Sequence, residues 1–591
     1  MSYDLILKGG NVIDVVARRT YKGNVLIKDG RIVGIEPPNT RYDKNSRKVV
    51  DVSKKYIAPG LIDAHLHIES SMLSPVEFSK KAVEHGTTSI FVDPHEVANV
   101  LGRKGIELFL KQAEAVPLDM YIGIPSCVPA THLENSGASI NLEDIKELIL
   151  HPRVYGLAEM MNAHGIIHNL GDAREKVDFV YDYGKIVDGH APGLTGKDLL
   201  TYVTNGRDDG KVRIMSDHEC SSAQEALEKH KAGMYIALRY GSASKDLDNI
   251  LPKLIKTNSR LDRFMLCSDD LDARELYENG HVDRSVKRAR EIVQSNSDLG
   301  LEEATMLALS LATQQPANYF SRFLKLNWHP LIGDVRINKK ANLVVFSSLE
   351  ELLIDKVVHN GKLVVDNGRY LGKEVRFDYS GFLKSMNTGR KISEHDFRIR
   401  YAGKKKSLEA RVIGAKQGSL LTDSLSLPFK VYRGLIKANP EQDIAKIGVF
   451  ERHNATGSYT VGFVKGLGIK RGAVGSTVAH DSHNMIIAGA DDKSMAMAAQ
   501  FLINQEGGMI VVTDSNIDYF PLSIGGLMST EPIERVVKEH KNLVKAVKRT
   551  GSDLDNIFMS LSFLALPVIP ELKITDKGLV DVNKFDFVRL Y

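Results

Sequence analysis

The sequence predicts an α/β protein built on a barrel of eight parallel strands, with two further domains beside it. Three observations lead to this prediction. Short apolar runs alternate with helical patterns over residues 58–325, glycine-punctuated strand patterns flank that region on both sides, and the pattern changes again after residue 376. At 591 residues the chain is also too long for a single hydrophobic core.

The composition is that of an ordinary globular protein, with 43% hydrophobic and 26% charged residues. A net charge of +4 is small for this length and gives no argument for a nucleic-acid partner, so none is expected. The first residues lack a signal-peptide pattern, and no uninterrupted apolar run is long enough to span a membrane. We therefore expect a cytoplasmic protein without a membrane partner. Three scattered cysteines support neither a disulfide framework nor a thiolate zinc site.

Residues 1–57 and 326–375 are predicted to form one small β-sandwich-like domain that is split by the central region. Two turn signals occur in the first segment, at Gly9-Gly10 and at Asp29-Gly30, and the second is typical of a hairpin. The strand patterns are Asp4–Lys8, Asn11–Asp14, Asn24–Ile27, Arg31–Ile35, Ala341–Phe346 and Val357–Val365. The early patterns are too short to be stable alone, so we expect them to pair with the late ones.

Residues 58–325 predict the (β/α)8 TIM-like barrel itself. The apolar runs are Leu61–Ala64, Thr88–Val92, Met120–Ile124, Val154–Ala158, Ile186–Val187, Val212–Met215, Met234–Leu238 and Phe264–Cys267. Helical patterns lie between them, at Val76–His85, Ile106–Ala115, Leu142–Leu150 and Ala223–Lys231. A doubly wound open sheet is the main alternative, but no Gly-x-Gly-x-x-Gly turn follows an early strand.

Imidazole and carboxylate side chains follow six of these eight apolar runs. They are His65 and His67; Asp93, His95 and Glu96; Glu159; His190; Asp217, His218 and Glu219; and Asp269 and Asp270. Residues two apart on a strand point to the same face, so His65 and His67 can share a metal ion. Because the active-site groups of such barrels lie where the strands end, the sequence predicts a metal centre there.

The ligand types and their number restrict the chemistry. Imidazole and carboxylate without thiolate suit manganese, ferrous iron or zinc. Four histidines and two carboxylates exceed the needs of one ion, so we expect two ions bridged by Glu159 and a hydroxide activated by the metal. Asp269 could accept the proton of the attacking water. Asp270, Glu219 and His95 remain for substrate contacts, for protonating a leaving group or for supporting a ligand.

The stretch Pro59–His67 resembles the first-strand signature of the amidohydrolase superfamily of metal-dependent hydrolases. Further stretches resemble the bacterial and archaeal adenine deaminases within it: His67–Met72, Val92–Val100, Gly156–Asn162, Val187–Gly193, Ser216–Glu219 and Leu266–Asp270. The resemblance implies hydrolysis of a purine base, adenine, to hypoxanthine and ammonia, as in purine salvage. It also implies six metal ligands and two Mn²⁺ per chain, with Fe²⁺ or Zn²⁺ as alternatives: His65, His67, Glu159, His190, His218 and Asp269.

Two positions depart from the superfamily pattern. Related cytosine deaminases have a glutamate three residues after the fifth-strand histidine, where this chain has Gly193. Proton delivery to the leaving amine must therefore come from another residue, with Glu219 and Asp269 as candidates. Asn342 stands where the superfamily often has aspartate, at a position we expect in the β domain and away from the chemistry.

Residues 376–591 predict a third, α/β domain. Its strand patterns are Leu420–Leu427, Lys446–Phe450, Tyr459–Phe463 and Met509–Val512, and its helical patterns are Lys493–Asn504 and Pro532–Lys548. The stretch Val478–Asn484 places two histidines and an aspartate together, which alone favours a polar turn. It resembles the C-terminal domain of adenine deaminases. We expect this turn to close over the substrate, so His483→Ala should raise KM or lower kcat without emptying the metal site.

Two other classes of function remain open. A cyclic-amide hydrolase similar to dihydroorotase or hydantoinase would use the same barrel, although many of those have a lysine where this chain has Glu159. A metal-binding protein without catalysis is disfavoured by the carboxylates beside the ligands. Candidates for contact with the substrate are His95, Glu96, Arg239, Asp270 and His483. A homodimer is possible.

Overall fold

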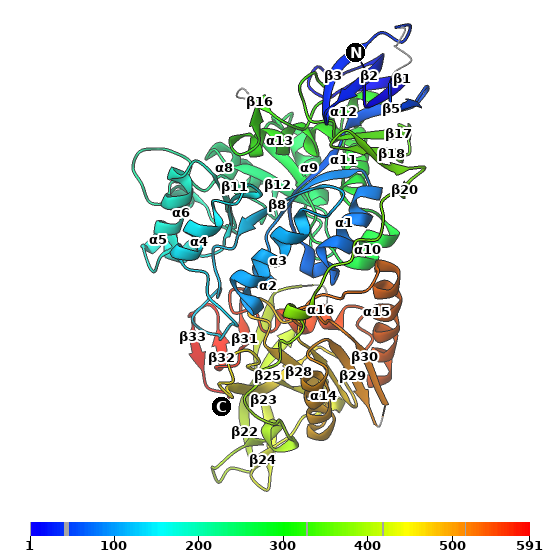
Figure 1. The fold of residues 1–591 in the computed structure, drawn as a ribbon. Helices are drawn as coiled ribbons and strands as arrows, with labels where there is room; N and C mark the ends of the chain where they lie inside the picture. Colours follow the sequence, from blue (N-terminus) through cyan, green and yellow to red (C-terminus); the bar gives the residue numbers. More distant parts are fainter. Residues whose placement is uncertain (1, 41–45, 327–328, 417–418, 515) are drawn as a thin grey trace.

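The computed structural model describes residues 2–40, 46–326, 329–416, 419–514 and 516–591. Figure 1 shows three parts stacked along the molecule: a β domain at the top, the barrel in the middle and the C-terminal domain below. None of the helices in these ranges combines the length and the apolar character needed to cross a membrane.

The β domain joins two segments that lie far apart in the sequence. Its nine-stranded sheet has the order β20-β19-β18-β17-β5-β1-β2-β3, with β4 beside β1. The strands are β1 Leu5–Asp14, β2 Arg19–Lys28, β3 Arg31–Glu36, β4 Val49–Asp51, β5 Tyr56–Pro59, β17 Leu343–Ser348, β18 Leu353–His359, β19 Lys362–Asp366 and β20 Arg369–Tyr370. Within the sheet, the two segments are joined by the antiparallel pair of β5 and β17.

Of the two turns predicted here, one is present, and the prediction of the other is wrong. The hairpin of β2 and β3 turns at Asp29 and Gly30, whose positive φ values of 49° and 74° suit these residue types. Gly9-Gly10 does not turn the chain. It lies within the continuous strand β1, where the pairing register with β2 shifts. Gly9 has a φ of 77°, so the two glycines form a β-bulge in place of a turn.

The barrel strands are parallel and follow the chain in circular order. They are β6 Leu61–His67, β7 Thr87–Val92, β8 Asp119–Ile124, β9 Val154–Met160, β10 Ile186–Gly189, β11 Ser216–Asp217, β12 Tyr235–Arg239 and β13 Phe264–Cys267, with β14 Asp269–Asp270 beside β6. The Met215 N–H donates to the Val187 carbonyl at 2.9 Å, which joins β10 to the β11 side. The predicted barrel is confirmed.

The sixth predicted strand is misplaced. Residues 212–215 are not a strand, and β11 begins only at Ser216. The N–H groups of Arg213 and Ile214 both donate to the carbonyl of Val203, at the end of α7 Gly196–Val203. The apolar side chain of Ile214 is buried, and within this run Met215 bonds to both neighbouring strands, through Val187 and Tyr235, so the apolar pattern reflects burial beside a strand that is shorter than predicted.

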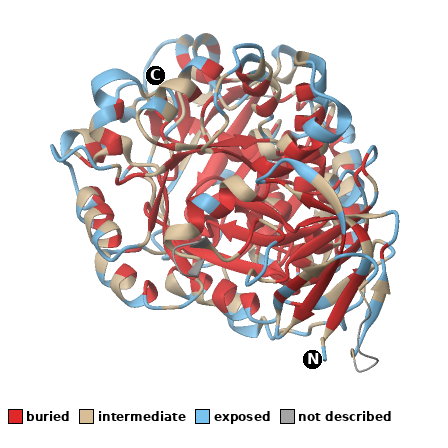
Figure 2. Cartoon of the chain, turned by 90° about the horizontal axis from the view of Figure 1, so that it is seen from above, coloured by how far each residue is buried: buried red, intermediate tan, exposed pale blue. Residues whose placement is uncertain are grey.

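Helices surround the barrel, with buried inner faces and exposed outer faces (Figure 2). Besides α7 they are α1 Pro75–Glu84, α2 His95–Leu101, α3 Arg103–Ala113, α4 Leu142–Leu148, α5 Ala163–His168, α6 Ala173–Asp182, α8 Ala223–Lys231, α9 Leu247–Lys256, α10 Ala273–Glu278, α11 Val282–Asn296, α12 Leu301–Leu311 and α13 Gln314–Tyr319. The four predicted helices are present as α1, α3, α4 and α8. Asn141 caps α4 in a capping box with Asp144.

The C-terminal domain contains a ten-stranded sheet with helices on both faces and a smaller sheet of β31 Leu572–Ile574, β32 Leu579–Asp581 and β33 Asp586–Val588. The order of the ten-stranded sheet is β21-β24-β23-β22-β26-β25-β28-β27-β29-β30. These strands are β21 Ile399–Arg400, β22 Ser407–Ala415, β23 Thr422–Tyr432, β24 Leu435–Ile436, β25 Ile444–Phe450, β26 Tyr459–Lys465, β27 Ala473–Ser476, β28 Met485–Gly489, β29 Met509–Thr513 and β30 Asn516–Phe520. Helix α14 Asp492–Asn504 covers one face, and α15 Ile533–Val547 and α16 Ile557–Phe563 cover the other.

Candidate metal centre

The six predicted ligands lie together at the carboxyl ends of the barrel strands. His65 and His67 end β6, Glu159 lies near the end of β9, and Asp269 begins β14. His190 directly follows β10, and His218 directly follows β11. All are at most 6% exposed except the half-buried His190. Side chains from five separate strand ends therefore meet in one buried place.

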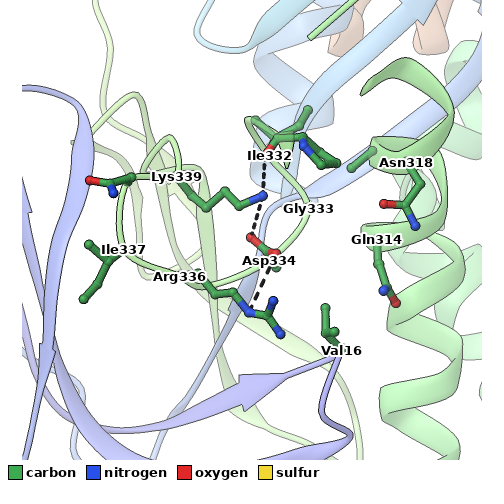
Figure 3. Close-up of a pocket in the computed structure, with 12 residues that line it drawn as sticks. Val16, Gln314, Asn318, Ile332, Gly333, Asp334, Arg336, Ile337 and Lys339 are labelled. Carbon is green, nitrogen blue, oxygen red and sulfur yellow. Dashed lines mark hydrogen bonds and ion pairs between the residues drawn. The ribbon is translucent and has the colours of Figure 1, made fainter. Parts of the chain in front are cut away.

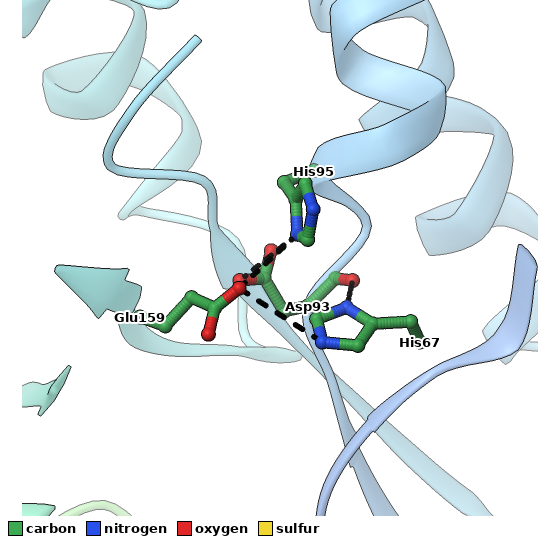
Figure 4. A group of neighbouring side chains, drawn as sticks. All are labelled: His67, Asp93, His95 and Glu159. Atoms are coloured by element: carbon green, nitrogen blue, oxygen red, sulfur yellow. Dashed lines mark hydrogen bonds and ion pairs between the residues drawn. The ribbon is translucent and has the colours of Figure 1, made fainter. Parts of the chain in front are cut away.

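The geometry of the histidine pair fits metal binding. The Nε2 atoms of His65 and His67 lie 3.2 Å apart. His67 Nδ1 lies 3.0 Å from the backbone carbonyl of Asp93, which can only accept, so Nδ1 carries a hydrogen and Nε2 is the nitrogen that can bind a cation once it gives up its proton. A histidine oriented by a carbonyl in this way is typical of metal ligands. Figure 4 shows this ring and that of His95 both facing the Glu159 carboxylate, with Asp93 beside them.

Glu159 lies between two pairs of imidazoles. His190 Nδ1 and His218 Nε2 are each 2.9 Å from Oε2 of Glu159. His65 Nε2 lies 3.9 Å from Oε2, and His67 Nε2 lies 3.9 Å from Oε1. Asp269 Oδ1 lies 3.3 Å from His67 Nε2 and 3.9 Å from His65 Nε2. A carboxylate in this position can bridge two cations.

The carboxylates of the cluster stabilise positive charge on the groups around them. Burial lowers the pKa of His218, but the Glu159 carboxylate outweighs it and raises the pKa to about 9. The pKa of His67 is likewise raised well above its usual value against the effect of burial, by Asp269 and Glu159. Burial and the neighbouring His218 hold the pKa of His65 well below its usual value. In the protein alone, protons supply the positive charge that cations would supply on displacing them.

Asp63 supports the cluster and was not predicted from the sequence. It is fully buried on β6, where it accepts hydrogen bonds from Ser268 N at 3.0 Å and Ser268 Oγ at 2.5 Å. It also accepts from His65 N at 3.3 Å and lies 3.0 Å from His281 Nε2. Asp63 thus joins the first and last barrel strands and fixes the backbone of a ligand. An ionisable residue inside an otherwise apolar strand is the signal that could have indicated it.

Arg239, predicted as a substrate contact, lies among three carboxylates. Its Nη1 is 3.2 Å from Asp269 Oδ2 and also contacts Glu219 Oε1, while its Nε donates to Asp246 at 2.8 Å. This environment favours a role in orienting Asp269 and Glu219. Gly193 is exposed, and its N–H donates to Glu225 on α8. Asn342 lies at the start of β17 and contacts Asp119 at the far end of the barrel, as the sequence indicated.

The polar turn of the C-terminal domain, residues 478–484, lies against the barrel cluster. Glu96 Oε1 is 3.7 Å from His480 Nδ1, and Glu96 Oε2 is 3.7 Å from His483 Nε2. Asp481 Oδ1 lies 3.9 Å from His95 Nε2. The sequence placed His480 and Asp481 in this turn without assigning them a site. Only the packing of the two domains shows that they face the barrel.

Three of the predicted substrate residues lie near the cluster: His95 contacts it directly, whereas Asp270 and Glu96 meet at Ser70. His95 lies next to the cluster, with Nδ1 3.4 Å from Glu159 and 3.5 Å from Asp93. Asp270 and Glu96 share the hydroxyl of Ser70, in the turn Ile68–Ser71 after β6, at 2.5 and 3.2 Å. Burial and the charge of Glu96 raise the pKa of the neighbouring Glu69 to about 8. The acidic side chains of Glu69, Glu96 and Asp270 therefore lie close together beside the metal cluster and the polar turn.

A surface pocket on the β-domain side of the barrel has a different character. It is lined by α13 and the loop before β17, and Figure 3 shows Lys339 and Arg336 directed at Asp334. These ion-pair distances are 3.3 and 3.9 Å. The lining contains no histidine and only this one carboxylate. The predicted site residues all lie outside this pocket.

The comparisons with known proteins agree with this site. The amidohydrolase family profile matches residues 56–364, and the profile of the adenine deaminase C-terminal domain matches residues 419–586. The barrel and its ligand cluster thus define a metal-dependent hydrolase of the amidohydrolase type. Relatives named adenine deaminase include proteins of Desulfatibacillum aliphaticivorans and Methanothrix thermoacetophila. Each is 39% identical to this chain over 100% of its length and 97% of the relative's. The chain belongs to the adenine deaminase family.

Among solved structures, a beta-aspartyl dipeptidase of Fervidobacterium islandicum AW-1 matches 64% of this chain and 100% of its own. The sequence identity is 16% and the TM-score is 0.46.

Proposed function

We propose that the protein hydrolyses adenine to hypoxanthine and ammonia. The observation that carries the proposal is the position of Glu159 between two imidazole pairs at the strand ends of a barrel of this family. His65, His67, Glu159, His190, His218 and Asp269 would hold two divalent cations, with Mn²⁺ proposed and Fe²⁺ or Zn²⁺ as alternatives. Such cations supply Lewis acidity, which makes water nucleophilic near neutral pH.

Asp269 is the proposed acceptor of the proton from the attacking water. Burial raises the pKa of its carboxyl, but the hydrogen bond to His67 and the charge of Arg239 outweigh burial and hold the pKa well below its usual range. The carboxylate is therefore charged and oriented before the reaction. The oxygen of water bonds to C6 of the purine, the C6–N bond breaks, and the proton passes to the leaving amine as ammonia forms.

Glu219 is the second candidate for protonating the amine. Its Oε1 contacts Arg239 and lies 3.6 Å from His218 Nε2. Its side chain is 18% exposed, more than that of Asp269, which is 8% exposed. Glu219→Gln retains the contact with Arg239 but cannot carry the proton. If Glu219 delivers it, this variant loses kcat while keeping its metal; if Asp269 delivers it, kcat changes little.

The decisive experiment loads the full chain with Mn²⁺ and supplies adenine. We expect ammonia release, the ultraviolet change to hypoxanthine, and two equivalents of metal per chain. Protein freed of metal with a chelator is the control and should be inactive. A cyclic amide such as a hydantoin tests the other hydrolase class, and turnover of the cyclic amide without turnover of adenine would contradict the proposal.

A further inference from the structure

His483 presents a hydrogen-bond donor that has no acceptor among the described residues. Its side chain is fully buried, and the backbone N–H of Ala479 donates to its Nδ1 at 3.2 Å. Because Nδ1 accepts, the ring hydrogen of the neutral imidazole is on Nε2. Nε2 forms no hydrogen bond within the described part of the chain and is directed at Glu96, 3.7 Å away.

Glu96, which faces His483, accepts few hydrogen bonds from the described residues. Its side chain is buried, and the Ser70 hydroxyl is its hydrogen-bond donor, at 3.2 Å. That hydroxyl has one hydrogen and lies closer to Asp270, at 2.5 Å. The His480 Nδ1 is 3.7 Å away, beyond hydrogen-bond distance. A buried acceptor and a buried donor thus lie side by side without satisfying each other, an arrangement that is costly unless a ligand completes it.

We propose that His483 and Glu96 together bind the N3/N9–H edge of a purine free base. The proposal rests on the proposed function and assigns the orientation of its substrate. In adenine, N3 accepts a hydrogen bond and N9–H, one carbon away, donates one. The His483 Nε2–H would donate to N3, and the Glu96 carboxylate would accept from N9–H. A nucleoside carries its sugar on N9, so this pair would select the free base.

The orientation is consistent with the proposed chemistry at C6. The N3/N9–H edge lies across the ring system from the amino group that leaves. His95, adjacent to Glu96 in α2, lies 3.4 Å from Glu159, so the pair of His483 and Glu96 lies near the metal cluster. His483 does not compete as a cation ligand, because its Nε2 carries the hydrogen. The strand ends of the barrel would therefore hold the reacting end of the purine, and Glu96 of the barrel helix α2 together with His483 of the C-terminal domain would hold the opposite edge.

The test compares substrate analogues in the Mn²⁺-loaded protein and its variants. Relative to adenine, wild type should lose kcat/KM about 10-fold or more with 3-deazaadenine and with 9-methyladenine, since each analogue leaves one buried polar group unpaired. In His483→Ala the 3-deaza penalty should shrink to about 2-fold or less, whereas the 9-methyl penalty persists. In Glu96→Gln, whose amide oxygen still accepts, the 9-methyl penalty should be reduced only in part.

Three controls keep the result specific. His483→Gln retains a side-chain N–H donor and should keep part of the discrimination. His230→Gln, on the outer helix α8 where Nε2 contacts the Asp262 carbonyl, should leave rates and penalties unchanged. 7-Deazaadenine should show the same penalty in wild type and His483→Ala.

The outcomes separate the inference from the proposed function. Equal 3-deaza penalties in wild type and His483→Ala would overturn the inference, as would a 7-deaza penalty that disappears in His483→Ala. A third equivalent of Mn²⁺ that is lost in His483→Gln would also overturn it. If no loaded protein releases ammonia from adenine, the proposed function fails instead.

Discussion

The two ends of the barrel differ in how their buried charged groups are hydrogen-bonded. At the amino end of β8, Asp119 accepts two contacts from Lys340 Nζ, at 2.7 and 2.8 Å, and one from Asn342 at 2.9 Å. His359 Nε2 lies 3.2 Å from the same carboxylate. At the carboxyl end, polar atoms of Glu69, Asp93, His95, Asp481 and His483 lie buried without hydrogen-bond partners in the described ranges.

This difference separates a structural end from a functional one. A buried polar group without a partner costs roughly 1–3 kcal/mol, so native proteins usually avoid it. The amino end uses charge to attach the β domain to the barrel. The carboxyl end keeps its polar atoms available, which is expected where cations and a polar substrate complete the contacts.

The largest effect should follow from Glu159→Gln. The amide keeps the shape of the side chain but removes the charge that lies between the two imidazole pairs. We expect loss of at least one equivalent of metal per chain and a fall of roughly 10³-fold or more in kcat/KM for adenine. Metal content measured by mass spectrometry, together with ammonia release, checks this. Full activity with a full metal complement would show that Glu159 does not bridge.

The ligand cluster could be predicted because its signal is local. His65 and His67 share a strand face, and the strand ends of a parallel barrel meet at one edge, so the alternation of strands and helices brings the ligands together. The β-domain pairing was predictable for a similar reason, since neither segment could be stable alone. The family resemblance added the identity of the substrate.

Other features of the site depend on long-range contacts, which the sequence pattern does not indicate. His480 and Asp481 face the barrel only because the C-terminal domain packs on that end. The Asp63 carboxylate serves Ser268, more than two hundred positions later in the chain. Gly9-Gly10 has the residues of a turn but lies in a strand. Residues 212–215 have the apolar residues of a strand but are not one. A bulge and a buried loop use the same residue types.

Asp63→Asn tests how far the functional end depends on support from outside its ligands. The amide replaces one acceptor oxygen with a donor that faces the donors of Ser268 or His281. We expect metal affinity to fall about 10–100-fold, because the His65 backbone loses its support. Titration of the metal-free protein with Mn²⁺ measures the affinity. Excess Mn²⁺ should restore most of the activity, and unchanged affinity would restrict Asp63 to a role in stability.

Arg452→Lys tests the other side of the functional end, the polar turn. The guanidinium is fully buried and donates to the carbonyls of His483, Ser385, Thr477 and Gly525, although burial lowers the pKa of Arg452 to about 9. A lysine has three donors on one atom and cannot reach all of these carbonyls. We expect about a 10-fold lower kcat/KM for adenine with metal content unchanged. Loss of metal would show that the turn supports the ligands as well.

Asp119→Asn should have the smallest effect on activity, because it changes only the structural end. Burial raises the pKa of the Asp119 carboxyl, but His359 and Lys340 outweigh it and hold the pKa well below its usual range. A carboxyl whose folded pKa is lowered stabilises the fold above its unfolded pKa, about 3.9, and loses that contribution as the pH falls towards the folded pKa.

Wild type should therefore exceed Asp119→Asn by about 1–3 kcal/mol in the free energy of unfolding at pH 7. The difference should shrink as the pH falls below about 4, while kcat/KM at pH 7 stays within about 2-fold of wild type. Denaturant unfolding at several pH values measures both trends. A difference that persists unchanged into acid would show that the Asp119 charge does not hold the β domain on the barrel, and the contrast between the two ends would then rest on the carboxyl end alone.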